Sequence, residues 1–177
     1  MLANYEWIRE NMSFKIVEIP ELSGTACRIY SIAYDGSMET SFDSFQDKMD
    51  ADGYSSEVDE IWYSLKFMGK EGGARIQFFK EDEGHPGDGV VALLKKKRFV
   101  LRLYCIRYGN GPLILGGGGY KPPSVRSWQD VTELNISAQE LIRISALITE
   151  RIKNKEIVLS PDGSLEGNLE FDDETEV

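Results

Sequence analysis

The clearest pattern along the chain is a pair of apolar runs that meet at a glycine-rich turn. The first run, Phe99 to Tyr108, is rich in aromatic and aliphatic residues, and the second extends from Pro112 to Leu115. Between them stands Gly109-Asn110-Gly111, which is typical of a tight reversal. A further apolar run, Val90 to Leu94, precedes them. The pattern predicts a three-stranded antiparallel meander.

Successive side chains of a strand point to opposite faces, so the central run of the meander divides into two sets. Those sets are Leu101, Leu103, Cys105 and Arg107 on one face, and Arg102, Tyr104, Ile106 and Tyr108 on the other. A charge in the middle of a strand is normally disfavoured, which makes Arg102 a candidate site residue. The alternative is that Arg102 pairs with a carboxylate from a helix packed on the sheet.

Apolar residues at helical spacing predict two helices before the meander and one after it. Ser41 to Met49 and Glu57 to Met68 are joined by Asp52-Gly53, so we expect a helical hairpin. The third helix is long, and Ser137 with Glu140 has the spacing of a capping box at its start.

Further strands are predicted at Phe14 to Ile19, at Cys27 to Tyr34 and at Ile157 to Leu159. The expected fold class is α+β, in which an antiparallel sheet of the meander and the N-terminal strands is packed by the helical hairpin and the C-terminal helix. A chain of 177 residues fits one such domain, which we place at residues 1–171. Residues 172–177 are mostly acidic and are expected to form a disordered tail.

Charge is divided unevenly along the chain, which has 20 basic and 30 acidic residues and a net charge of −10. The stretch from Val90 to Ser127 contains no acidic residue, so it carries +8 against −18 for the remainder. Its basic residues are Lys95, Lys96, Lys97, Arg98, Arg102, Arg107, Lys121 and Arg126. Like charges crowded on a surface are costly unless a ligand uses them, so we expect a face that binds a polyanion or an acidic partner.

Composition disfavours several kinds of site. Cys27 and Cys105 fall in predicted strands without a CxxC spacing and are expected to be buried free thiols. With a single histidine a zinc site is not expected, and we predict neither a metal nor a cofactor. That histidine, His85, lies in the loop EDEGHPGDG, where it is either a solvated side chain or a proton carrier near the basic strands.

Four consecutive glycines, Gly116 to Gly119, follow the last apolar run. Glycine is poor in a strand interior, so we expect the backbone to turn sharply there or to be approached closely by another group. A phosphate-binding loop of the Walker type is disfavoured, because Pro122 and Pro123 follow Lys121 where the helix of that motif should begin.

Nothing in the sequence suggests a membrane segment. No apolar run approaches the roughly 20 residues that cross a bilayer, and the N-terminus lacks the apolar core of a signal peptide. We therefore expect a cytoplasmic protein that does not associate with membranes.

The order strand, two helices, three-stranded antiparallel sheet and C-terminal helix resembles the RelE/ParE superfamily of bacterial type II toxins, in particular its HigB-like, phage-related branch. The residues that carry the resemblance are the helical hairpin ending in glycines, the strand LRLYCIRY, the turn GNG and the run GGYK, all within Glu57 to Lys121. The resemblance implies a prokaryotic or phage toxin, a metal-independent endoribonuclease that cuts mRNA on the ribosome and is inhibited by an antitoxin protein.

On the matching positions, the resemblance implies that Arg102 and Arg107 bind phosphate and that Lys121 stabilises charge. It also implies that Tyr120 stacks on a base or carries a proton. The reaction needs a deprotonated ribose 2′-hydroxyl, cations for the phosphorane and a proton donor for the leaving 5′-oxygen. Because Arg102 and Arg107 point to opposite faces of a regular strand, both can serve one site only if a bulge intervenes.

We include His85 in the candidate catalytic set and expect the remaining basic residues of the segment to bind RNA. These nucleic-acid-binding candidates are Lys95, Lys96, Lys97, Arg98 and Arg126. All the cations are expected to converge on one exposed concavity of a small curled sheet.

Two other interpretations remain open. Members of the family that cut mRNA are usually strongly basic, whereas this chain has a net charge of −10. A non-catalytic module of the same fold, whose basic sheet holds an acidic protein partner, is therefore the alternative. In a third interpretation, the acidic tail from Asp172 lies over the basic face of its own chain.

Overall fold

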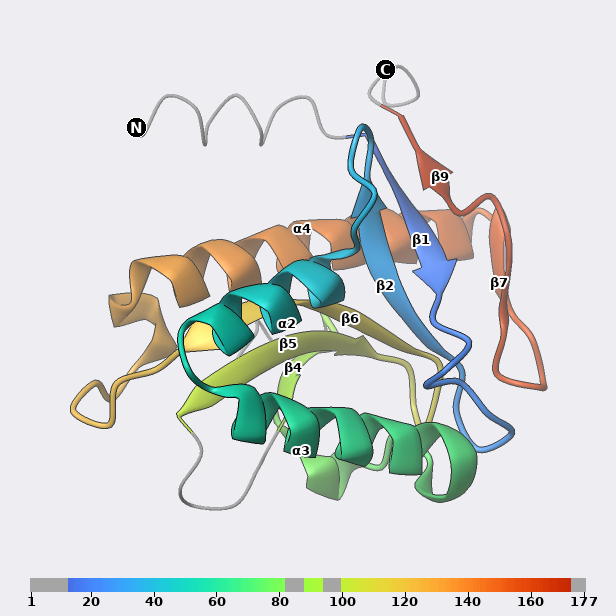
Figure 1. The fold of residues 1–177 in the computed structure, drawn as a ribbon. Helices are drawn as coiled ribbons and strands as arrows, with labels where there is room; N and C mark the ends of the chain where they lie inside the picture. Colours follow the sequence, from blue (N-terminus) through green and yellow to red (C-terminus); the bar gives the residue numbers. More distant parts are fainter. Residues whose placement is uncertain (1–12, 82–87, 94–99, 173–177) are drawn as a thin grey trace.

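The structure is a computed structural model that describes residues 13–81, 88–93 and 100–172. Its strands are β1 (Phe14–Glu18), β2 (Ile29–Tyr34), β3 (Phe79–Lys80), β4 (Val90–Leu93), β5 (Leu101–Arg107), β6 (Leu113–Tyr120), β7 (Ile157–Leu159), β8 (Leu165–Gly167) and β9 (Glu170–Phe171). Seven of them form one sheet in the order β3-β4-β5-β6-β2-β1-β9, and β7 pairs with β8 (Figure 1). Every neighbouring pair is antiparallel except β2 and β6, which are parallel. The predicted meander is thus confirmed as β4-β5-β6.

Helices cover both faces of the large sheet. They are α2 (Ser41–Ala51), α3 (Ser55–Phe67) and α4 (Thr132–Lys153), with the short turns η1 (Met68–Gly72), η2 (Ile76–Phe78) and η4 (Trp128–Asp130). The α2–α3 hairpin lies on one face and α4 on the other (Figure 1). The chain is therefore α+β as predicted, and the sheet is the middle of three layers.

Local sequence explains where the hairpin begins and turns. Thr40 caps α2 with a capping box, because its hydroxyl accepts the backbone N–H of Asp43 at 3.2 Å and the Asp43 carboxylate accepts that of Thr40 at 2.9 Å. The link to α3 passes through Gly53, whose φ of +93° favours glycine. Both helices turn an apolar side to the sheet.

The core has two halves because side chains alternate across the sheet. Leu101, Leu103 and Cys105 of β5 pack against α2 and α3, whereas Tyr104 and Ile106 pack against α4. The division of β5 into two faces is confirmed. Cys27 and Cys105 are both buried free thiols, which is also as predicted.

The predicted start of the last helix is wrong. α4 begins at Thr132, so Ser137 and Glu140 lie inside it rather than at its cap. Tertiary contacts explain these two residues instead. Ser137 lies over Gly117, and the Glu140 carboxylate accepts a hydrogen bond from the Tyr34 hydroxyl.

The four glycines do not turn the chain, because all of them lie within β6. The other expectation, a close approach, is confirmed. A Cβ on Gly116 would stand 3.0 Å from Leu141 of α4, and one on Gly118 would overlap the carbonyl oxygen of Arg102. The run therefore allows α4 to pack closely on the strand, so it is a helix-packing surface.

The last described strand belongs to the domain. Phe171 of β9 is buried and stacks on Phe14 of β1, with ring centroids 4.5 Å apart. Of the predicted tail, only Asp172 lies within the described residues. In the described part of the chain, no helix is both long and apolar enough to cross a membrane.

Candidate nucleic-acid interface

Arg102 lies near the start of β5, on the face of the sheet that α4 covers. Within the described residues its guanidinium makes one hydrogen bond, in which Nη1 donates to the Leu101 carbonyl oxygen at 3.1 Å. Its Nε is buried and has no partner. No described carboxylate forms an ion pair with it. The alternative of an arginine paired with a carboxylate from a helix is thus not observed in this part of the chain.

An unpaired buried donor costs about 1–3 kcal/mol relative to a paired one. Such a group in a folded protein calls for an explanation, and contact with a ligand is one of them. Arg102 is half-buried, so part of its side chain is open to solvent. This combination is suitable for binding an oxyanion, because a guanidinium binds carboxylate or phosphate through two parallel N–H donors.

Lys121 lies at the same end of the sheet. Its backbone N–H donates to the carbonyl oxygen of Val100 at 2.6 Å, next to the start of β5. Its ammonium group donates to the carbonyl oxygen of Val125, also at 2.6 Å. The segment then carries the exposed Arg126 and leads to Trp128, which belongs to the core under α4.

The strand register places Arg102 and Lys121 close together on one face. Arg102 of β5 lies directly opposite Gly119 of β6, and Lys121 follows Gly119 by two residues along the chain. Side chains in this diagonal relation lie about 7–8 Å apart, within reach of long side chains. Arg102, Lys121 and Arg126 together form what we call the cationic end of the sheet.

Arg107 lies elsewhere. It is on the α3 face of β5 and at the opposite end of the strand, where its Nε donates to the carbonyl oxygen of Ala74 at 2.6 Å. A weaker contact joins its Nη2 to the Asn110 side-chain oxygen at 3.5 Å. The Asn110 carbonyl in turn accepts the N–H of Ala74 at 2.8 Å. Arg107 therefore fastens the β5–β6 turn to the segment that follows α3.

A bulge is present, but it does not bring the two arginines together. The register shifts between Leu103 and Cys105, and the extra residue is in β6, because Leu103 pairs with Gly118 and Cys105 with Leu115. The alternation of β5 stays intact, so Arg102 and Arg107 face opposite sides. The convergence expected for all the cations is not found, since Arg107 lies apart from the cationic end.

Tyr120 also faces away from Arg102. Its ring packs against the α2–α3 half of the core and stacks on Tyr54, at 5.5 Å between centroids and an interplanar angle of 20°. Desolvation raises the pKa of Tyr54, and the Tyr120 hydroxyl and the Glu57 carboxylate raise it further. Tyr54 therefore remains protonated at neutral pH. One side of the Tyr120 ring is already occupied by another tyrosine.

An ion pair that the sequence pattern did not reveal joins the two helical layers beside the cationic end. The ammonium of Lys48 on α2 lies 2.5 Å from Glu133 Oε1 on α4. Gly119 is the residue of β6 that lies opposite Arg102. A Cβ on Gly119 would lie 3.5 Å from Glu133 Oε2. Lys48 offsets the charge of Glu133, so the cationic end keeps its positive character.

Five predicted site residues lie outside the described residues. They are His85, Lys95, Lys96, Lys97 and Arg98. The strands on either side of the last four are described, and both β4 and β5 meet the undescribed segment at the end of the sheet where Arg102 lies.

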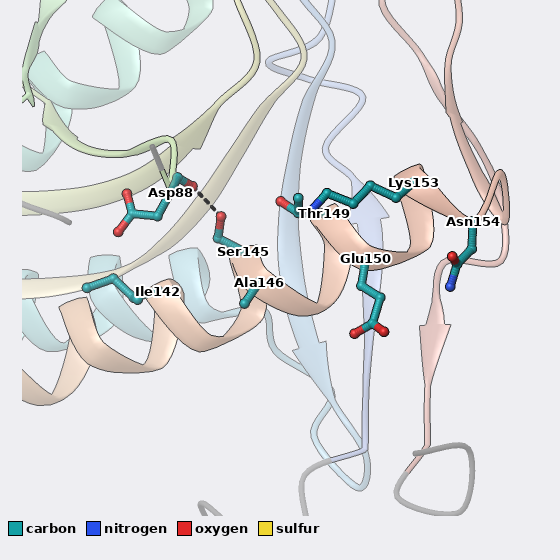
Figure 2. A pocket seen from close by; sticks show the side chains of 8 residues that line it. All are labelled: Asp88, Ile142, Ser145, Ala146, Thr149, Glu150, Lys153 and Asn154. Atoms are coloured by element: carbon teal, nitrogen blue, oxygen red, sulfur yellow. Dashed lines mark hydrogen bonds between the residues drawn. The ribbon is translucent and has the colours of Figure 1, made fainter. Parts of the chain in front are cut away.

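A hollow of about 540 Å³ lies along the second half of α4, next to Asp88 (Figure 2). The Ser145 hydroxyl donates to the Asp88 backbone carbonyl at one end of it, and Lys153 lies near the other (Figure 2). Its charged groups are Asp88, Glu150 and Lys153. Two carboxylates against one ammonium group make it less suitable for phosphate than the cationic end.

Among the described residues, no group of histidine, cysteine, aspartate or glutamate side chains could hold a metal ion. The two thiols do not add a reactive site, because burial raises the pKa of Cys27 to about 11 and also raises that of Cys105.

The chain has no significant match among protein-family models, curated proteins or solved structures.

Proposed function

We propose that the chain binds the phosphate backbone of RNA at the cationic end and, like the RelE/HigB-like toxins that it resembles, cleaves it without a metal. The observation that carries the proposal is the arrangement of Arg102 and Lys121, diagonal neighbours on one face of the sheet, with no ion pair to a described carboxylate. A duplex or single strand presents closely spaced phosphates, and neighbouring cations bind them by releasing counterions.

In the reaction proposed, water takes the proton of the ribose 2′-hydroxyl while the 2′-oxygen attacks the adjacent phosphorus. The bond from phosphorus to the 5′-oxygen then breaks, which leaves a 2′,3′-cyclic phosphate and a 5′-hydroxyl whose proton comes from water. Arg102 and Lys121 would stabilise the charge on the phosphorane. Arg126 is exposed and would bind a neighbouring phosphate. Under this proposal the partners are mRNA on the cytoplasmic ribosome and an antitoxin protein.

One observation favours the alternative of a binding module without catalysis. Tyr120, which the resemblance implies as a proton carrier, lies on the face opposite Arg102 and packs on Tyr54. If no proton donor or acceptor reaches the phosphate, the cationic end would bind an anion without cleaving it. In that case the ligand would be an acidic segment of a protein, held by the same two cations.

The experiment measures binding and cleavage of a labelled single-stranded RNA by the full chain. We expect Arg102→Ala with Lys121→Ala to weaken binding by at least about ten-fold and to lower the salt dependence of the affinity, because two phosphate contacts are lost. Arg107→Ala is the control for position, since it removes one positive charge from the other face of the sheet. Equal binding by the double variant and the wild type would refute the proposal.

Cleavage separates the two functions. Appearance of shorter RNA with the wild type, and not with the double variant, supports the nuclease. Salt-sensitive binding without cleavage, with polyglutamate competing as effectively as RNA, would support the acidic-partner module instead.

A further inference from the structure

The ion pair beside the cationic end places a carboxylate within reach of two different cations. The Lys48 ammonium on α2 lies 2.5 Å from Glu133 Oε1 on α4, and both side chains are about half exposed. Oε2 of the same carboxylate lies 3.5 Å from the position of a Cβ on Gly119. One oxygen of Glu133 therefore contacts Lys48, and the other faces the strand pair that carries Arg102.

The glycine run explains how side chains of the two helical layers can meet here. β6 pairs with β2 through Leu113–Leu115, and from Gly118 onward it pairs only with β5 among the described strands. Both α2 and α4 contact β6. Because the glycines carry no side chains, they leave space beside the strand, and Lys48 reaches Glu133 there.

Arg102 is also close enough to pair with Glu133. Residues directly opposite one another in an antiparallel pair have Cβ atoms about 4.5–5.5 Å apart, so the Arg102 side chain starts close to the Cβ position of Gly119. Even so, no ion pair joins Arg102 to Glu133 within the described residues. The Arg102 Nε is buried without a partner instead. A hydrogen bond between two charged groups is stronger than one between neutral groups, so a released Glu133 carboxylate should turn to Arg102.

The helix ends explain the two charges separately but not their contact. Glu133 lies in the first turn of α4, where a carboxylate interacts favourably with the helix dipole. Lys48 lies in the last turn of α2, where a cation is favourable for the same reason. The contact of 2.5 Å between them decides which way the Glu133 carboxylate faces.

We propose that Lys48 is a positioning residue of the cationic end, which holds the Glu133 carboxylate away from Arg102 and so leaves the guanidinium available to an anion. When Lys48 is lost, Glu133 becomes an internal competitor for Arg102. This inference rests on the proposed function only in that the cationic end binds phosphate. The effect is modest and falls with salt, because the ion pair is partly exposed.

The first test measures the affinity of the full chain for a labelled single-stranded RNA at low ionic strength. Lys48→Met should weaken binding by about two- to five-fold, and Glu133→Gln should strengthen it by a similar factor. In the Glu133→Gln background Lys48→Met should have a clearly smaller effect, because no carboxylate remains to be held. Lys66→Met is the matched control, since it removes the same charge from an exposed position on α3.

A second readout needs no RNA. In the Lys48→Met protein Glu133 should pair with Arg102, so their variants Glu133→Gln and Arg102→Ala should be coupled. The coupling should change the unfolding equilibrium constant by about two- to five-fold in urea denaturation, whereas the same cycle with Lys48 present should show none. Absence of coupling in the Lys48→Met protein would overturn the proposal.

Failure of the proposed function and failure of this inference can be told apart. If the Arg102→Ala, Lys121→Ala variant binds RNA as the wild type does, the phosphate site is refuted, and the unfolding cycle still decides the role of Lys48. If that variant loses binding, but Lys48→Met weakens binding equally with and without Glu133, the site stands. In that case Lys48 acts only as a charge, and its positioning role is refuted.

Discussion

Arg102 and Arg107 share a strand, yet their surroundings give them different roles. Arg107 donates to the Ala74 carbonyl oxygen at 2.6 Å, whereas Arg102 has a buried Nε with no partner. The sequence identified both residues as candidates because both are charges in an apolar run. It could not separate them, because the acceptor of Arg107 is a backbone carbonyl, and any residue at position 74 would provide that oxygen.

For Arg107, we predict a loss of stability without a loss of RNA affinity. Arg107→Ala removes a charged hydrogen bond that joins the β5–β6 turn to the segment after α3. The free energy of unfolding should fall by about 1–3 kcal/mol, measured by urea denaturation. Loss of RNA binding by a variant that remains folded would contradict the structural role.

The thiols provide a prediction about pH. Burial raises the pKa of Cys27 from its ordinary value of 9.0 to about 11. Below pH 9 the thiol is protonated in both the folded and the unfolded chain, so its contribution to stability is constant. Between pH 9 and about 11 the unfolded thiol loses its proton first, so the free energy of unfolding should fall.

The comparison that isolates Cys27 is Cys27→Ala. Its free energy of unfolding should decline less steeply than that of the wild type over the same pH range. A thiol reagent at pH 8 should modify the folded wild type far more slowly than the denatured chain. Rapid modification of the folded protein would contradict the burial of the Cys27 thiol.

At the scale of elements, the hairpin, the meander and the long helix were predictable because each has its own periodicity and turn residues. The glycine run was half-predicted. Propensity disfavours Gly116 to Gly119 in a strand, but the packing of α4 on β6 outweighs that preference. The false capping box has a similar cause, since Ser137 and Glu140 match a local motif but serve contacts to other elements.

The packing of β6 predicts opposite outcomes for neighbouring glycines. A Cβ on Gly118 would overlap the Arg102 carbonyl oxygen, whereas one on Gly117 would make an ordinary contact with Ser137 at 3.5 Å. Gly118→Ala should therefore lower the free energy of unfolding by about 3 kcal/mol or more, and Gly117→Ala by less than about 1 kcal/mol. Thermal denaturation of the two variants checks this, and equal effects would contradict the close pairing of β5 and β6.

At the scale of the whole molecule, the sheet separates two surfaces. The cationic end lies on the side of α4, and Arg107 lies on the side of α3. The sequence predicted the α+β class but not the parallel pairing of β2 with β6, which joins strands far apart in the chain. No local feature of the sequence predicts this pairing, because the apolar side chains of a buried strand pack into the core whether the neighbouring strand is parallel or antiparallel. The uneven charge of the sequence predicted a binding face. Only the strand register shows that Arg102 and Lys121 lie on the same face of the sheet and that Arg107 does not.

The central claim is that Arg102 and Lys121 form one anion-binding unit from which Arg107 is excluded. A double-mutant cycle on RNA affinity at fixed salt tests it most directly. We predict a coupling free energy of about 0.5–3 kcal/mol between Arg102→Ala and Lys121→Ala, and additive effects within about 0.5 kcal/mol for Arg102→Ala with Arg107→Ala. Coupling of Arg102 to Arg107 and not to Lys121 would contradict the account.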